Sequence, residues 1–167
     1  AAFVIERLES AQARGANVLA RVRGSDRAFA VPAQMEERLV RSIRETLARA
    51  GVCPADVGHV NANGTGVVSE DRMEAQGLAR VLPNCPVFAP KSYFGLLGPS
   101  TGAVELVCSL LALRQQILPA TLNYRTPDPD CPVLVRSENT PLTSPVALIV
   151  NQSPTGQVAA LAIESAV

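Results

Sequence analysis

The sequence has no excess of charge of either sign. Its 15 basic side chains (Lys and Arg) balance 15 acidic ones (Asp and Glu), and the formal net charge is zero. Proteins that hold nucleic acid or an anionic membrane by electrostatic attraction carry a basic field, which this chain lacks. We therefore expect a partner that is a protein or a small molecule, met through apolar contact. A net charge near zero also leaves little protection against self-association.

Sequence patterns for metal binding and disulfide bonding are also missing. There is no Cys-x-x-Cys pair, and His59 is the only histidine. Zinc sites in proteins use closely grouped Cys and His ligands, so the sequence predicts no metal site, and we expect no cofactor. Irregularly spaced cysteines without a secretory leader are typical of free thiols in a reducing compartment, which predicts a cytoplasmic protein.

Long hydrophobic runs are absent as well. The longest apolar stretch, residues 106–113, is interrupted by Ser109 and is far shorter than the roughly 20 residues that cross a bilayer. Yet 47% of the residues are hydrophobic and only 18% are charged, which argues against disorder. A chain of 167 residues is long enough for one domain with a real core.

The hydrophobic pattern alternates between strand and helix periodicity. The clearest helix spans residues 32–50, where Met35, Leu39, Ile43 and Leu47 recur every four residues before a C-capping glycine. Ser69 has the position of an N-cap for a second helix. The other expected elements are strands at 2–6, 18–22, 57–62, 87–89, 145–151 and 157–164, helices at 7–14, 70–81 and 103–116, and loops at 24–30 and 123–132.

Helices that alternate with strands predict an α/β fold in which helices cover a mixed sheet. The last two strands flank residues 152–156 and predict an antiparallel hairpin with a looped tip. The helix at 103–116 is apolar on nearly every side, so we expect it to be deeply buried between two sheets. The chain also opens with a strand-like run and no initiator methionine, so we expect it to be a piece of a longer protein.

Four segments match the sequence motifs of one family. They are Val60-Asn61-Ala62-Asn63-Gly64-Thr65 with Asp71 to Ala75, Lys91-Ser92 with Gly102 to Glu105, Leu110 to Asn123, and Asn151 to Gly156. They resemble the β-ketoacyl-acyl-carrier-protein synthases (ketosynthases), with motifs V-N-A-H-G-T and D-x-x-E-A, K-S-x-x-G-H-x-x-G-A-x-G-A-V-E, L-A-L-R-x-x-x-x-P-P-T-x-N, and N-S-F-G-F-G-G-x-N. The resemblance covers essentially the whole chain.

The resemblance implies the thiolase-like fold, which has two similar halves, each a five-stranded sheet with helices on both faces. Residues 1–15 would be the last strand and short helix of the first half, and residues 16–167 the C-terminal domain. In this family an acyl group moves from a carrier protein to a cysteine, and decarboxylated malonyl carrier protein then condenses with it. That chemistry needs a thiolate and donors that stabilise an enolate.

The two catalytic histidines of the family are missing. Asn63 stands at the first histidine position, and an amide donates a hydrogen bond but does not titrate near neutral pH. Leu96 stands at the second position and offers no donor. The resemblance further places Lys91 on the catalytic lysine, Thr65, Asn151, Ser153 and Gly156 on substrate-binding positions, and Asp71, Glu74 and Glu105 on acids that we interpret as structural.

Two further departures concern the hairpin tip and the nucleophile. The segment 152–156 lacks both phenylalanines of the family loop, and Pro154 has no N–H to donate. The nucleophilic cysteine belongs to the first half of the fold, and none of Cys53, Cys85, Cys108 and Cys131 matches its motif. We interpret His59 as a packed or surface strand residue, with a catalytic role as the alternative.

Three functions stay open at this level. The first is a non-condensing homologue that resembles the chain-length factors, which pair with an active ketosynthase and shape its pocket. The second is an active acyltransferase with altered chemistry, in which Asn63 holds a thioester carbonyl or a water and the nucleophile comes from the absent half. The third is an interaction module or a fragment that binds an acyl chain or carrier protein. The expected partners are an acyl carrier protein and an N-terminal half or a ketosynthase subunit; neither nucleic acid nor a membrane is expected.

Overall fold

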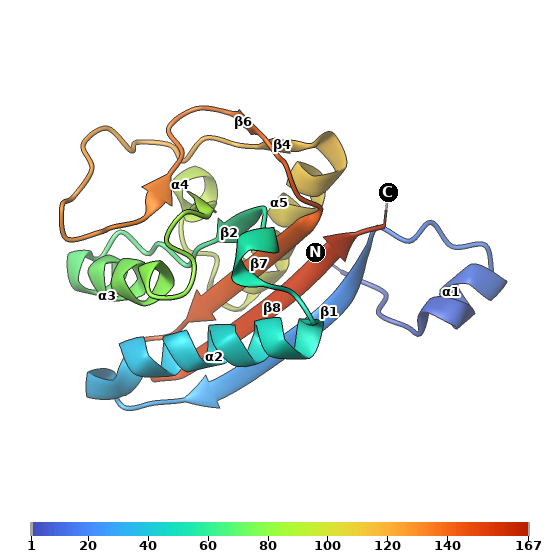
Figure 1. Ribbon diagram of the computed structural model, residues 1–167, viewed down its shortest axis with the longest axis horizontal. Coiled ribbons are helices and arrows are strands. Elements are labelled where there is room, and N and C mark those ends of the chain that lie inside the picture. Colours follow the sequence, from blue (N-terminus) through green and yellow to red (C-terminus); the bar gives the residue numbers. More distant parts are fainter. Residues whose placement is uncertain (1, 167) are drawn as a thin grey trace.

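The structure is a computed structural model that describes residues 2–166, and its centre is a mixed six-stranded sheet (Figure 1). The strand order is β1-β8-β7-β2-β3-β5, and a separate two-stranded sheet pairs β4 with β6. The strands are β1 (Ala20–Phe29), β2 (His59–Asn61), β3 (Pro86–Phe88), β4 (Ile117–Leu118), β5 (Leu134–Val135), β6 (Thr140–Pro141), β7 (Val146–Gln152) and β8 (Gln157–Ser165). The α/β class with a mixed sheet is confirmed. The sheet was expected to have five strands and has six, because the two-residue strand β5 adds one at its edge.

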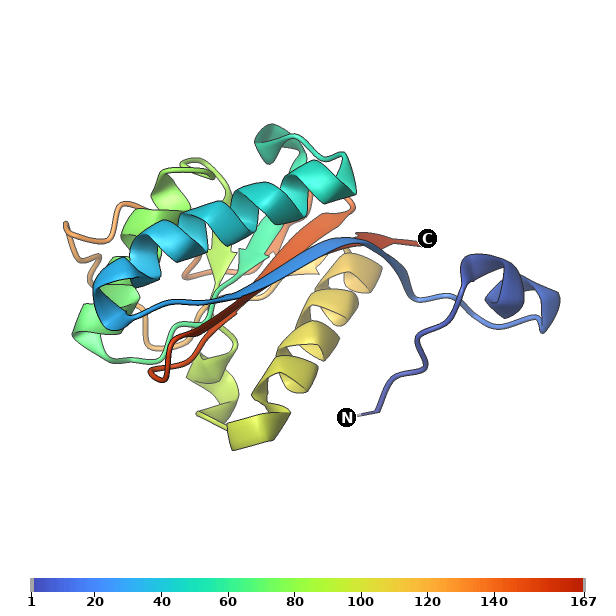
Figure 2. The ribbon, with the colours of Figure 1, turned by 90° about the horizontal axis from the view of Figure 1, so that it is seen from below.

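Helices lie on both faces of the sheet, as predicted (Figure 2). The helices α2 and α3 pack together on one face, and α5 lies on the other against β7 and β8. The α-helices are α1 (Leu8–Ala13), α2 (Met35–Ala50), α3 (Val68–Ala79), α4 (Lys91–Phe94) and α5 (Thr101–Gln115), and the 3-10 helices are η1 (Pro32–Gln34), η2 (Pro54–Asp56) and η3 (Gly98–Ser100).

Strand β7 divides the apolar interior into two cores. Its residues alternate, so Leu148 and Val150 join the larger core beneath α2 and α3, while Ala147 and Ile149 join a smaller core beneath α5. The sequence of a strand that is covered on both faces is a continuous apolar run rather than an alternation of apolar and polar residues. The predicted hairpin is confirmed, because β7 pairs with β8 in antiparallel register from Val146↔Glu164 to Gln152↔Val158.

Strand β1 corrects the prediction of a loop at residues 24–30. It continues to Phe29 as an antiparallel edge strand on β8, with a bulge between Val22 and Gly24. A Cβ atom at Gly24 would stand 2.5 Å from the backbone oxygen of Thr46 in α2. The glycine therefore marks a close approach between strand and helix rather than the end of the strand.

The first residues correct another prediction. Residues 2–6 form no strand, and the side chains of Val4 and Ile5 are 80% and 81% exposed. A strand needs a neighbour for its backbone groups, and this segment lies away from the sheet beside the projecting α1 (Figure 2). The short helix α1 is confirmed, and Gly15, with φ of +68°, ends it. The division into domains at residue 15 stays a prediction.

Two helices differ from the sequence expectation in detail. The predicted N-cap Ser69 is wrong, because α3 begins at Val68 and makes no side-chain cap hydrogen bond. Helix α5 is not deeply buried: among the described residues one face packs on the sheet, and Leu111 on the other side is 51% exposed. Its second expected neighbour would have to come from outside the described residues. Within residues 2–166, no helix is long and apolar enough to cross a membrane.

Candidate functional site

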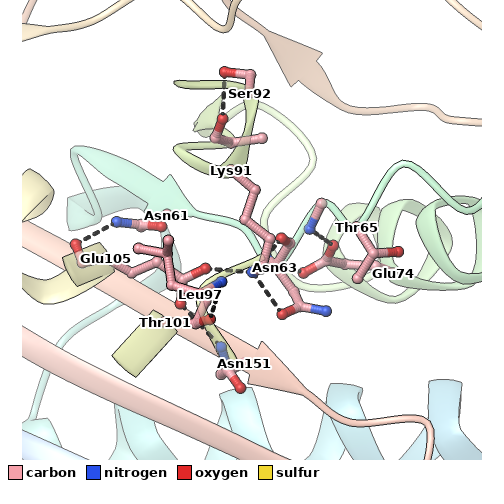
Figure 3. A network of polar contacts seen from close by, with 12 residues as sticks. Asn61, Asn63, Thr65, Glu74, Lys91, Ser92, Leu97, Thr101, Glu105 and Asn151 are labelled. Carbon is pink, nitrogen blue, oxygen red and sulfur yellow. Dashed lines mark hydrogen bonds and ion pairs between the residues drawn. The ribbon is translucent and has the colours of Figure 1, made fainter. Parts of the chain in front are cut away.

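The centre of the candidate site is the buried ammonium group of Lys91, the only lysine of the sequence. From the short helix α4 its Nζ donates hydrogen bonds to the backbone oxygen of Asn63 (2.6 Å) and to the side-chain oxygen Oδ1 of the same residue (2.9 Å). It also forms an ion pair with Glu105 of α5. The second carboxylate oxygen of Glu105 accepts a hydrogen bond from Asn151 Nδ2 at 2.9 Å (Figure 3). Four residues from four different segments therefore meet around one buried charge.

The loop that carries Asn63 is fixed by two carboxylates of α3. Glu74 accepts hydrogen bonds from the backbone N–H groups of Asn63 (2.7 Å) and Gly64 (2.8 Å), and Asp71 accepts from those of Thr65 (2.8 Å) and Gly66 (3.0 Å). Burial raises the pKa of Glu74 to about 7, against the opposing effect of the two backbone donors. The backbone of residues 63–66 is thus held by side-chain carboxylates, and a structural role for these acids stays a prediction.

A second polar cluster lies beneath α5. Asn61 Nδ2 donates to the backbone oxygen of Glu105 (2.7 Å) and to Ser109 Oγ (2.9 Å), and His59 Nε2 lies 3.2 Å from the same hydroxyl. His59 is fully buried, and this burial lowers its pKa to about 4. His59 is therefore a packed, neutral strand residue. Reasoning from sequence missed Asn61 and Ser109, although Ser109 is the polar interruption of the longest apolar run.

Two cavities flank this network. The first, of about 480 Å³, lies at the outer ends of β2, β3 and β5 under the loop at residues 121–133. The second, of about 320 Å³, lies between the start of α2, the start of α3 and the hairpin tip. Asn63 and Ser153 line the second cavity, Thr65, Lys91 and Leu96 line the first, and Asp71 and Glu74 contribute to both. Asn63 and Leu96, the two predicted histidine positions, thus line different cavities.

Three further residues that the sequence predicted for the site, Leu96, Thr65 and Gly156, lie outside the hydrogen-bond network of Lys91. Leu96 is 75% exposed, in the turn between α4 and η3. The Thr65 hydroxyl donates to Glu70 of α3 at 2.9 Å, so it is already engaged within the loop. Gly156 is buried at φ of +101°, and a Cβ atom there would stand 2.3 Å from the backbone oxygen of Ala30. It is therefore required by backbone packing.

The family of the chain follows from comparison with known proteins. Residues 16–125 match the family described as "Beta-ketoacyl synthase, C-terminal domain". The chain belongs to the β-ketoacyl synthase family. Asn63, Lys91, Leu96 and Glu105 all lie within the matched residues, whereas the hairpin tip lies outside them.

Individual relatives agree with this family. The chain is 39% identical over 137 residues to the 3-oxoacyl-[acyl-carrier-protein] synthase 2 of Mycobacterium leprae, covering 78% of this chain and 33% of that protein. The oxazolomycin ketosynthase domain of Streptomyces albus superposes with a TM-score of 0.90 at 28% identity, over 97% of this chain and 32% of the other. The ishigamide ketosynthase/chain length factor superposes with a TM-score of 0.87 at 28% identity, over 95% of this chain and 41% of the other. The chain spans about a third of the length of the curated relatives it matches.

The cysteines of this β-ketoacyl synthase domain are all free thiols. Burial raises the pKa of Cys85 to about 12, and burial also raises the pKa of Cys108 and Cys131. A raised pKa lowers the fraction of reactive thiolate, so the environments of these three side chains oppose a nucleophilic role. Cys53 is exposed, in the turn before η2.

Proposed function

We propose that the chain is the C-terminal half of a β-ketoacyl synthase-like protein of fatty acid or polyketide biosynthesis that does not itself condense. In this proposal it acts, in the cytoplasm, as a chain-length-factor-like partner of an active ketosynthase and meets an acyl carrier protein. Residues 1–15 then belong to the end of the N-terminal half. The similarity to a ketosynthase/chain length factor structure and to an acyl-carrier-protein synthase supports this assignment.

The observation that carries the proposal is the chemistry at Asn63 and Leu96. Decarboxylation of a malonyl thioester develops negative charge on the thioester oxygen, which needs preorganised donors. Leu96 provides none, and Asn63, whose side-chain oxygen accepts from Lys91, offers only one neutral amide group as a donor. Lys91 itself is neutralised by Glu105 and does not line the second cavity, where Asn63 lies. Neither position therefore replaces a histidine pair.

The hairpin tip adds independent support. The backbone N–H of Ser153 donates to Gln157 O (2.9 Å), that of Thr155 to Ser153 Oγ (3.2 Å), and that of Gly156 to Ser153 O (2.9 Å). Pro154 has no N–H. Every backbone donor from residue 153 to residue 156 is thus consumed inside the turn. An oxyanion bound beside this turn would find no free backbone N–H group there.

The experiment is a reconstituted condensation assay. The full-length protein is incubated with malonyl and acyl carrier protein, alone and then with a ketosynthase subunit from the same source. The proposal predicts no β-ketoacyl product from the protein alone, and a change in product chain length when it joins the active subunit. Condensation by the protein alone would overturn the proposal.

A second candidate, an acyltransferase with altered chemistry, is favoured by one feature of Asn63. Because its Oδ1 accepts from Lys91, its Nδ2 amide group is left as a donor, and it makes no hydrogen bond to any residue from 2 to 166. Asn63 lines the second cavity, so this donor can orient a thioester carbonyl. Acyl transfer from a carrier protein to a thiol or water, lost in Asn63→Leu but kept in Leu96→Ala, would favour this candidate over the first.

A further inference from the structure

The outermost strand of the sheet, β1, is remote from the residues on which the proposed function depends. It pairs with β8 on one side, and among residues 2–166 no strand pairs with its other side (Figure 1). It has ten residues, about twice the length of an average strand. A long free edge presents unpaired backbone groups with which a second chain can form a ladder. A stable protein has to prevent such pairing at an edge of this length.

Every second residue of β1 directs its backbone groups away from the sheet. The N–H of Ala30 donates to the backbone oxygen of Gly156 at 2.8 Å, which fixes the alternation of the antiparallel ladder. In the paired register the backbone groups of residues 24, 26 and 28 then face β8. Those of Ser25, Arg27 and Phe29 therefore point outward, toward the free edge.

The outward oxygen of Ser25 already has a partner. Arg49, in the last turn of α2, donates from Nη1 to this oxygen at 2.7 Å, and the same nitrogen lies 2.9 Å from the carboxylate of Asp26. Ser42 of α2 donates to the other carboxylate oxygen of Asp26 at 2.9 Å and so holds that side chain in place. A second chain that paired with Ser25 would have to displace the Arg49 guanidinium from both oxygens.

The contact of Arg49 stabilises the fold only slightly. Its side chain is 55% exposed, and an ion pair with this exposure contributes little to stability because water and salt screen it. The chain also has zero net charge, so general charge repulsion does not keep copies apart. The effect of Arg49 is therefore local, since it covers one outward carbonyl of the free edge.

The exposed side chain of Arg27 opposes pairing with a second copy of the same strand. In the antiparallel register that uses all three outward residues, Ser25 of one copy lies opposite Phe29 of the other. Arg27 then lies opposite the same residue of the other copy. Like charges directly opposite each other destabilise a strand pair, so this register is disfavoured.

We propose that Arg49 and Arg27 together prevent β1 from pairing with the β1 strand of a second copy of the chain. Arg49 caps the oxygen of Ser25, and Arg27 adds charge repulsion. The interface that they prevent is an antiparallel pair of β1 strands, which would join two sheets edge to edge. This role does not depend on whether the protein condenses, because neither arginine belongs to the candidate site.

The test compares two double variants of the full-length protein that differ only at position 27. Both contain Arg49→Ala, one with Arg27→Val and the other with Arg27→Pro. Either change removes the charge, but proline also removes the outward N–H with which a second strand would pair. The loss of this N–H breaks no hydrogen bond to β8. Light scattering during size-exclusion chromatography measures the mass of each variant over a range of protein concentrations.

The variant with Arg27→Val should form species larger than the parent protein at a concentration at least about ten-fold lower, because neither cap nor charge opposes pairing. The variant with Arg27→Pro should associate no more than the parent. In the larger species the amides of residues 25, 27 and 29 should exchange hydrogen about ten-fold more slowly, since they then lie in a ladder.

A second comparison avoids proline and its effect on folding. Arg49→Ala alone should lower the concentration for association about three-fold. Its matched control is Arg80→Ala, which removes exposed ion pairs with Glu36 and Glu37 away from β1 and should leave association unchanged. Equal association of these two single variants would overturn the proposal. So would parent-like association of the Arg27→Val variant, or larger species in which residues 25, 27 and 29 exchange as fast as in the parent.

Discussion

The Nζ atom of Lys91 lies 2.6 Å from the backbone oxygen of Asn63 and 2.9 Å from its side-chain oxygen, so one ammonium group holds both. This contact fixes the orientation of the amide at the first histidine position of the family. It also ties the loop at residues 63–66 to α5, because Glu105 pairs with the same ammonium. At the position where the resemblance predicts the catalytic lysine, Lys91 thus makes contacts that join two segments of the fold.

Lys91→Met should be strongly destabilising. The variant leaves the Glu105 carboxylate buried without its cation, a change that costs about 3–5 kcal/mol. Urea denaturation of the full-length protein measures the loss, and Lys91→Met combined with Glu105→Leu should recover part of it. The control is Arg80→Met, which removes exposed ion pairs with Glu36 and Glu37 and should cost less than about 1 kcal/mol. Equal losses in the two single variants would contradict the account.

Glu74 should make stability fall as pH rises. Burial raises the pKa of its carboxyl from 4.5 to about 7, so the folded protein binds more protons than the unfolded chain in this interval. The contribution of Glu74 to the free energy of unfolding is present below pH 4.5 and is lost as the pH rises to about 7. Relative to Glu74→Gln, the parent protein should lose roughly 3 kcal/mol across this window. Denaturation of both proteins at several pH values tests this, and a constant difference between them would refute it.

His59 should make stability fall as the pH decreases, which is opposite to the effect of Glu74. Burial lowers the pKa of its imidazole from 6.5 to about 4, so the folded protein binds fewer protons than the unfolded chain. Its contribution is present above pH 6.5 and is lost as the pH falls toward about 4. The same pH series on His59→Gln should show a stability curve that lacks this acid-side decline. A decline equally steep in variant and parent would mean that other groups cause it.

Gly24→Ala should destabilise the contact between β1 and α2. The new Cβ would stand 2.5 Å from Thr46 O and 2.8 Å from Ala50 N, and both are backbone atoms that cannot rotate away. Overpacking of this kind costs about 1–3 kcal/mol. Ser25→Ala, at the next and exposed position of the same strand, should stay within about 0.5 kcal/mol. Thermal or urea denaturation of the pair distinguishes a steric effect from a general sensitivity of β1.

The elements that were predictable from sequence have a strong local signal. Helix α2 carries a four-residue apolar repeat, and Gly51 ends it at φ of +64°, although its first turn is the 3-10 helix η1. The hairpin of β7 and β8 follows from two apolar runs around one turn. These features depend on residues close in the sequence, so pattern alone locates them.

The failures have tertiary causes. The sequence suggested that a strand ends at Gly24. The glycine is instead required because the backbone of α2, more than 20 residues away in the sequence, passes close to it. The composition of α5 predicted burial, but among the described residues only one sheet covers it. At the site, the family motifs located Asn63, Lys91 and Glu105, whereas the first cavity depends on Tyr124 and Cys131 in a loop without periodic pattern.

The most direct test of the central claim is the rate at which the full-length protein, without a partner, decarboxylates malonyl carrier protein. The parent protein is compared with Asn63→His combined with Leu96→His, since two histidines restore the donors of the family. We predict release of CO₂ no faster than the uncatalysed background for the parent and measurable turnover for the double variant. Turnover by the parent protein alone would contradict the claim that the substitutions at Asn63 and Leu96 remove ketosynthase chemistry.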